Sequence, residues 1–236
     1  MTDTGTDEIG HTHADISGGW LRPATFGAMD GLVTNIALVA GVGGGGASGH
    51  LILLSGVAGL VAGAFSMALG EYASVETQNN SVLAEAAVER REQREHPKAE
   101  QAELARMYEE SGLSQDLAQR VAAEVHQNPD LAVRVHIQKE IGLDPEDQPS
   151  PVTAAISSFL CFSLGALLPL VPYLLGFDSL VAGLAIGAVG LFVVGALTSK
   201  FTTRSWWFSG LRQLGFGVIA AGATYLVGAL IGVSAG

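Results

Sequence analysis

The stretch FGAMDGLVTNIALVAGV, residues 26–42, consists of apolar, small and neutral polar residues except for the single carboxylate of Asp30. It lies in an apolar block over residues 24–45, about as long as the roughly 20 residues that an α-helix needs to cross a bilayer. A carboxylate inside such a helix is costly unless it is paired or hydrated, and acids in this setting usually face a polar pathway. The stretch therefore predicts a membrane-spanning helix whose acid has a function.

The rest of the chain repeats the apolar pattern, with one long interruption. Of the 236 residues 48% are hydrophobic, and they are grouped into long blocks. The blocks cover residues 24–45, 51–70, 152–176, 179–199 and 208–235. Between the second and third blocks the chain is charged, rich in Ala and poor in Gly. We therefore expect an all-α, polytopic membrane protein with five transmembrane helices and a cytosolic helical insert between helices two and three.

This pattern divides the chain into four parts. The first is a short, polar, acidic tail that we expect to be disordered. The second apolar block runs into the insert without a helix breaker, so its helix should continue beyond the membrane, and His96-Pro97 and Asn128-Pro129 should interrupt the insert. The parts are the tail 1–20, transmembrane helices one and two 21–77, the helical insert 78–149, and transmembrane helices three to five 150–236.

The positive charges indicate the orientation. Of the 12 Lys and Arg residues, nine lie in the N-terminal flank and the insert, and three lie around the connection between the last two blocks. With five spans, all of these segments fall on one side of the membrane, and the positive-inside bias makes that side cytosolic. We therefore expect the N-terminus and the insert to be cytosolic and the C-terminus to be outside.

Composition excludes several classes of protein. The net charge of −11 argues against nucleic-acid binding, and the only cysteine, Cys161, lies in a predicted span and forms no disulfide framework. The first twenty residues contain no Lys or Arg and do not form a signal peptide. No catalytic constellation is evident, so we do not expect an enzyme. An Ala-, Gly- and Val-rich chain without a targeting signal favours a bacterial plasma membrane.

Three residues near the cytosolic ends of the first two spans could line a transport pathway. Asp30 lies about six residues into its span, or roughly 9 Å deep. Met67 and Glu71 lie four residues apart in FSMALGEY and therefore share a helix face at a similar depth. Two carboxylates and a thioether could form a transient site for a divalent metal. The alternatives are an Asp30 that reaches the interface or caps a helix, and a Met67 that is only core.

The insert carries a spacing of glutamates that could bind metal. Glu89, Glu92, Glu100 and Glu103 follow the pattern E-x2-E-x7-E-x2-E, which falls within an arc of roughly 80° on one continuous helix. Four carboxylates in one stripe repel each other, so a cation could compensate them. The alternative is an ordinary solvated face, compensated by neighbouring arginines.

A second pair in the insert could complete that site. His136 and Glu140 are four residues apart and share a face. Oxygen ligands with one imidazole suit ferrous iron, manganese or zinc. The spacing alone does not establish that this helix meets the glutamate stripe.

The motifs MDGLVTNIALVAGV, GLVAGAFSMALGEYASV and the glutamate spacing of the insert resemble those of the vacuolar iron transporter family, over nearly the whole chain. The resemblance implies a homodimer of five-span subunits that exchanges cytosolic Fe²⁺ for protons. It implies a pore at the dimer interface that uses Asp30 and Met67, with Glu71 in the same segment. It also implies metal binding by the glutamates of the insert and Glu140. The family has a Met where this chain has His136, which makes Zn²⁺ or Mn²⁺ more plausible than in the family.

Other functions remain open at this stage. The chain could be a membrane-anchored metal sensor or buffer, a manganese or zinc exporter, or a transporter of an unrelated solute whose glutamates are merely solvated. Fe²⁺ is the first expectation for the metal, with Mn²⁺, Zn²⁺ and Co²⁺ as alternatives. The favoured interpretation is a metal/proton antiporter that moves metal out of the cytosol across the lipid bilayer and so serves iron homeostasis.

Overall fold

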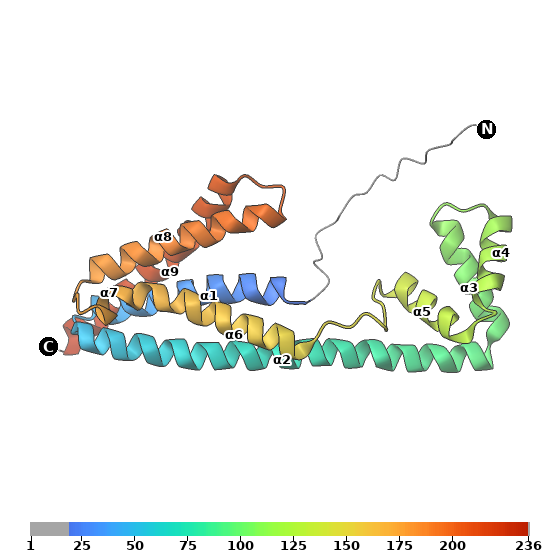
Figure 1. Ribbon diagram of the computed structural model, residues 1–236, viewed down its shortest axis with the longest axis horizontal. Coiled ribbons are helices and arrows are strands. Elements are labelled where there is room, and N and C mark those ends of the chain that lie inside the picture. Colours follow the sequence, from blue (N-terminus) through green and yellow to red (C-terminus); the bar gives the residue numbers. More distant parts are fainter. Residues whose placement is uncertain (1–18, 236) are drawn as a thin grey trace, which may run out of the picture.

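The computed structural model describes residues 19–235, which form helices and no strand. The prediction of an all-α protein is thus confirmed over this range, whereas most of the tail predicted to be disordered lies outside it. Figure 1 shows an elongated molecule with a bundle of apolar helices at one end and a group of short helices at the other. The elements are α1 Leu21–Gly44, α2 Gly49–Glu95, α3 Pro97–Glu110, α4 Gln115–Val125, α5 Pro129–Glu140, α6 Pro151–Leu167, η1 Leu168–Leu170, α7 Val171–Leu174, α8 Leu180–Thr198, η2 Ser199–Phe201 and α9 Trp206–Ala235.

Five helical segments are long and apolar enough to cross a membrane, judged by length and composition. Their bounds agree closely with the apolar blocks of the sequence, except that the second segment extends 25 residues beyond its block at residue 70. The number of spans and the cytosolic place of the insert remain predictions, because length and composition alone do not place a helix in a bilayer. The segments are Leu21–Gly44, Gly49–Glu95, Pro151–Leu174, Leu180–Phe201 and Trp206–Gly232.

The helix α2 joins the apolar bundle to the group of short helices. It has 47 residues, which correspond to about 70 Å at 1.5 Å per residue, far more than the roughly 30 Å of a hydrocarbon core. The side chain of Ser48 caps its first turn. It ends at His96 because Pro97 cannot donate a backbone hydrogen bond and disfavours helical geometry in the residue before it. The prediction that the second apolar helix continues into the insert is confirmed.

The third apolar segment is interrupted at its prolines. Helix α6 passes into the 3₁₀ turn η1 at Pro169 and then into the short α7, which contains Pro172. Nearby, the fully buried side chain of Asn35 on α1 donates a hydrogen bond to the backbone carbonyl of Ala166. A buried amide needs such a partner, so this bond fixes α1 against α6.

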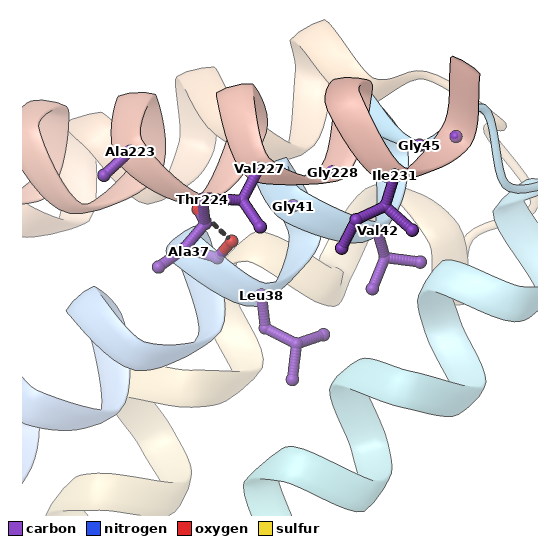
Figure 2. Close-up of a pocket in the computed structure, with 11 residues that line it drawn as sticks. Ala37, Leu38, Gly41, Val42, Gly45, Ala223, Thr224, Val227, Gly228 and Ile231 are labelled. Carbon is purple, nitrogen blue, oxygen red and sulfur yellow. Dashed lines mark hydrogen bonds between the residues drawn. The ribbon is translucent and has the colours of Figure 1, made fainter. Parts of the chain in front are cut away.

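Glycines allow the backbones of α1 and α9 to touch. A Cβ atom at Gly228 would collide with the carbonyl group of Gly41, and one at Gly232 would lie 2.6 Å from the carbonyl oxygen of Gly45. Beside this contact the hydroxyl of Thr224 donates a 2.6 Å hydrogen bond to the carbonyl of Ala37 (Figure 2). Close packing of small residues is a common way to join helices in a membrane, where no hydrophobic effect drives them together.

Replacing Gly228 by Ala should destabilise the bundle by about 1–3 kcal/mol, because the added methyl group overpacks the contact with α1. The measurement is the midpoint of thermal unfolding in detergent. Gly222→Ala is the matched control on the same helix, since no atom lies within 4 Å of the position that its Cβ would take. Equal midpoints for the two variants would contradict the glycine contact.

Candidate metal site

The candidate site lies where the short helices pack on the far half of α2. Val82 and Ala86 of α2 form one buried cluster with Val133 and Ile137 of α5. These apolar residues follow the helical repeat, so the polar residues that continue the same two faces are turned toward each other. A separate buried cluster, made by Leu104, Ala105 and Ala122, joins α3 to α4.

Three buried side chains from three helices meet at this place. Single ligand atoms of Glu89 on α2, Glu100 on α3 and His136 on α5 all lie within 4.8 Å of one another. The Nδ1 atom of His136 lies 3.2 Å from Glu89 and 3.7 Å from Glu100, and it also lies 3.7 Å from Glu140. His136 is completely buried, and Glu89 and Glu100 are 7% and 9% exposed.

The four glutamates do not lie on one helix. The prediction that they form a single stripe on a continuous helix is therefore wrong. The break at His96 and Pro97 places the first two on α2 and the last two on α3. The chain turns at the break, and this turn brings Glu89 and Glu100 together. Glu92 and Glu103 lie at the edge of the cluster. Glu92 pairs with Arg91 and His96, and Glu103 pairs with Arg106 at 3.2 Å.

The cluster has more negative charge than its surroundings neutralise. Burial, followed by repulsion from Glu89, Glu103, Glu140 and Glu92, raises the pKa of Glu100 to about 7. Burial and neighbouring glutamates also raise the pKa of Glu140. Burial lowers the pKa of His136, which disfavours the imidazolium that could compensate these acids. A divalent cation would supply the missing positive charge.

Two further residues belong to the surroundings of this cluster and were not identified from the sequence. Glu85, one turn before Glu89, contributes to the raised pKa of Glu140. Its place four residues before Glu89 is the signal that could have found it. The ring of His126, at the end of α4, lies 5.3 Å from the ring of His136. No spacing links these two histidines, because they come from different helices.

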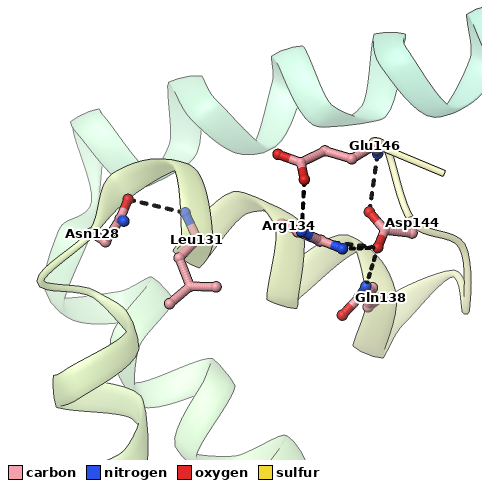
Figure 3. A network of polar contacts seen from close by, with 6 residues as sticks. All are labelled: Asn128, Leu131, Arg134, Gln138, Asp144 and Glu146. Carbon is pink, nitrogen blue, oxygen red and sulfur yellow. Dashed lines mark hydrogen bonds and ion pairs between the residues drawn. The ribbon is translucent and has the colours of Figure 1, made fainter.

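A polar network holds α5, and with it His136, to the linker that returns to the bundle. Arg134 pairs with Asp144 and, at 2.6 Å, with Glu146, while Gln138 donates a 2.7 Å hydrogen bond to Asp144 (Figure 3). A backbone hydrogen bond from Glu146 and then the contacts of Arg134 lower the pKa of Asp144, so this carboxylate stays charged.

Two amide side chains complete the attachment of the linker and α5. Asn79 on α2 donates a 3.0 Å hydrogen bond to the carbonyl of Pro149 in the linker. Asn128 caps the start of α5 by accepting from the backbone of Asp130 and Leu131 (Figure 3). The position of α5 is thus fixed relative to both α2 and the beginning of α6.

The three predicted pathway residues have different neighbours within one chain. Asp30 is half-buried on α1, with the side chain of Thr34 as its hydrogen-bond partner. Met67 packs against a core cluster that includes Phe162 of α6. Glu71 is 8% exposed and lies 3.7 Å from Arg22. The structure therefore places the three at separate contacts, rather than in one ligand set of a single chain.

The chemistry of the cluster suits a divalent cation. Carboxylate oxygens with one imidazole nitrogen are ligands for Fe²⁺, Mn²⁺ and Zn²⁺. Buried acids without a counter-ion are unfavourable, so the cluster gains from binding a cation. Fold and site together define a helical membrane protein with a buried carboxylate–imidazole cluster outside its apolar bundle.

Sequence comparison gives the family. The VIT family matches residues 21–229, and the chain belongs to it. It is 28% identical over 225 residues to vacuolar iron transporter 1 of Arabidopsis thaliana, which covers 94% of this chain and 90% of that protein. It is 32% identical over 219 residues to vacuolar iron transporter homolog 3 of the same plant, over 90% of this chain and 84% of the relative. The vacuolar iron transporter of Toxoplasma gondii is 29% identical, over 96% of this chain and 79% of the relative. The resemblance proposed from the sequence motifs is confirmed.

The metal-free protein should lose stability as pH rises. The pKa of Glu100 is about 7 in the folded state against 4.5 ordinarily, so its stabilising contribution is present below pH 4.5 and is lost as pH rises through about 7. Glu100→Gln removes the ionisation, so the variant should unfold at a higher temperature than wild type at pH 8 but not at pH 5. Each kcal/mol of added stability should raise the unfolding temperature by about 2–4 °C.

The measurement is thermal unfolding in the presence of a chelator. Glu109→Gln, an exposed glutamate on the same helix, is the control and should follow wild type at both pH values. A constant difference between Glu100→Gln and wild type across this range would contradict the raised pKa.

Proposed function

We propose that this chain moves a divalent metal, Fe²⁺ first, out of the cytosol in exchange for protons. The observation that carries the proposal is the buried cluster of Glu89, Glu100 and His136 in a chain whose relatives are named vacuolar iron transporters. Those relatives support the coarser statement directly: the chain is a transporter of divalent metal and not an enzyme.

The insert acts as a capture domain for cytosolic metal. Its cluster offers two carboxylates and an imidazole whose ligand atoms lie within 4.8 Å of one another, with the more exposed Glu140 beside them. The raised pKa of Glu100 and Glu140 reflects acids that repel each other, so a cation relieves repulsion as it binds. Metal then competes with protons for the same oxygen atoms.

Antiport would follow from one titratable site inside the membrane that cannot hold both a metal ion and a proton well, and Asp30 is the candidate. When metal is bound its carboxylate is compensated by the cation, and when metal leaves toward the acidic side a proton takes its place. In one chain Asp30, Met67 and Glu71 contact different neighbours. A pathway built from them therefore needs a second copy, in a homodimer whose pore lies between the subunits.

The orientation follows the positive charges of the sequence. The N-terminus and residues 78–149 are cytosolic, five helices span the membrane, and the C-terminus is outside. In the plasma membrane of a bacterium, this orientation exports metal from the cell.

The presence of His136 supports a second candidate for the metal. An imidazole in the cluster shifts the ligand set toward zinc, and the carboxylates also suit manganese. A manganese or zinc exporter with the same mechanism is therefore the alternative. A membrane-anchored metal sensor or buffer would use the same cluster without transport.

Asp30→Ala should abolish metal-coupled proton movement. The measurement uses proteoliposomes with an acidic lumen, following Fe²⁺ uptake and luminal pH together. Wild type should take up metal while the lumen becomes alkaline, and the variant should do neither although it still binds metal through the insert. Binding without flux in the wild type, with Fe²⁺, Mn²⁺ and Zn²⁺ alike, would favour the sensor.

Glu89→Gln should weaken capture without stopping transport. Loss of a buried charged ligand should raise the metal concentration for half-maximal uptake by at least about tenfold, the change that ~1.4 kcal/mol of lost binding gives. The maximal rate should change much less, because the pathway residues are intact. Glu109→Gln is the control. If Glu89→Gln left the metal concentration for half-maximal uptake unchanged, the result would show that the insert does not capture metal for transport.

A further inference from the structure

Both ring nitrogens of His136 are buried without a hydrogen bond among the described residues, and Nδ1 is the one that lies near the acids. Its Nδ1 atom lies near the oxygens of Glu89, Glu100 and Glu140. Its Nε2 atom is buried and has no hydrogen-bond partner among the described residues. A neutral imidazole carries its proton on one nitrogen only. If Nδ1 is to bind a metal with the carboxylates, the proton must stay on Nε2, where it needs an acceptor.

The neighbouring His126 has an acceptor nitrogen that lacks a donor. Its Nδ1 atom lies 2.8 Å from the carbonyl oxygen of Ala122. A carbonyl only accepts hydrogen bonds, so Nδ1 carries the proton and Nε2 has the free lone pair. That Nε2 atom is also buried and without a hydrogen-bond partner in the described part of the chain.

The two rings are in contact. Their centroids are 5.3 Å apart and their planes are inclined by 81°, an edge-to-face arrangement. Both Nε2 atoms therefore belong to neighbouring buried rings, and the χ2 torsion of histidine has broad minima that let a ring adjust its orientation. One unsatisfied donor and one unsatisfied acceptor thus lie side by side, and each would otherwise remain unpaired at a cost.

We infer that His126 is a positioning residue for metal capture: it accepts a hydrogen bond from Nε2–H of His136 and so directs the lone pair of Nδ1 to the metal. This inference rests on the proposed function of the cluster. Histidines that bind metals in proteins generally donate their second N–H group to an acceptor, and losing that acceptor typically lowers metal affinity about 10- to 100-fold. In this chain the acceptor would be an imidazole held by the end of α4.

The test is a competition titration of the full-length protein in detergent with Zn²⁺. His126→Phe keeps a ring against His136 but has no acceptor, and it should lower the affinity by about 10- to 100-fold. His126→Gln offers an amide oxygen as the acceptor and should retain most of the affinity. In a His136→Ala background, His126→Phe should have no further effect, since His126 acts through His136.

A spectroscopic readout separates positioning from general support of the fold. With ¹⁵N-labelled histidine, the Zn²⁺-bound protein should show Nδ1 of His136 bound to metal and its Nε2 protonated, and His126 not bound to metal. Three results would overturn the inference: equal affinity of His126→Phe and wild type, an effect of His126→Phe that persists without His136, or Zn²⁺ bound directly by His126. A wild-type protein that binds none of Zn²⁺, Mn²⁺ and Fe²⁺ would overturn the proposed metal capture together with this inference.

Discussion

The unbroken backbone hydrogen bonding of α2 is the constraint on which the rest of the structure depends. From Gly49 to Glu95 no proline interrupts the helix, although the sequence changes from apolar to charged along the way. The apolar half packs against α6 and α1, and the charged half presents Val82, Ala86 and Glu89 to α5. A break between the halves would leave the short helices without a fixed partner, and the buried cluster would lose one of its three sides.

The cluster itself is a balance between packing and repulsion. Apolar contacts between α2 and α5 bring His136 to Glu89, and the same contacts remove the acids from water. Burial of like charges is unfavourable, so the helices hold the acids together against their repulsion. A binding site built in this way is already shaped before the cation arrives, and the gain on binding comes from relief of repulsion as well as from new bonds.

Much of the fold could be predicted from the sequence, because the signals are local. Apolar blocks of membrane length and the prolines at positions 97, 169 and 172 determine where helices run and where they end. The contact between Glu89 and Glu100 could not be predicted from the spacing of the glutamates, because that spacing was interpreted on one straight helix. The contact depends on the turn at His96. The role of His126 could not be predicted, because its partner His136 lies on another helix. No sequence pattern in α4 indicates a contact between the two rings.

The length of α2 has a consequence for the proposed transport, in which the insert and the membrane would each hold a metal ion. Glu71, at the end of the apolar half, and Glu89 lie on the same helix, and their separation of 18 positions corresponds to about 27 Å. The Debye length at physiological ionic strength is about 8 Å, so mobile ions screen almost all of the Coulomb interaction across the water between the two places. In the proposed transporter, an ion held by the insert would therefore not repel one in the membrane, and both positions could be filled at once.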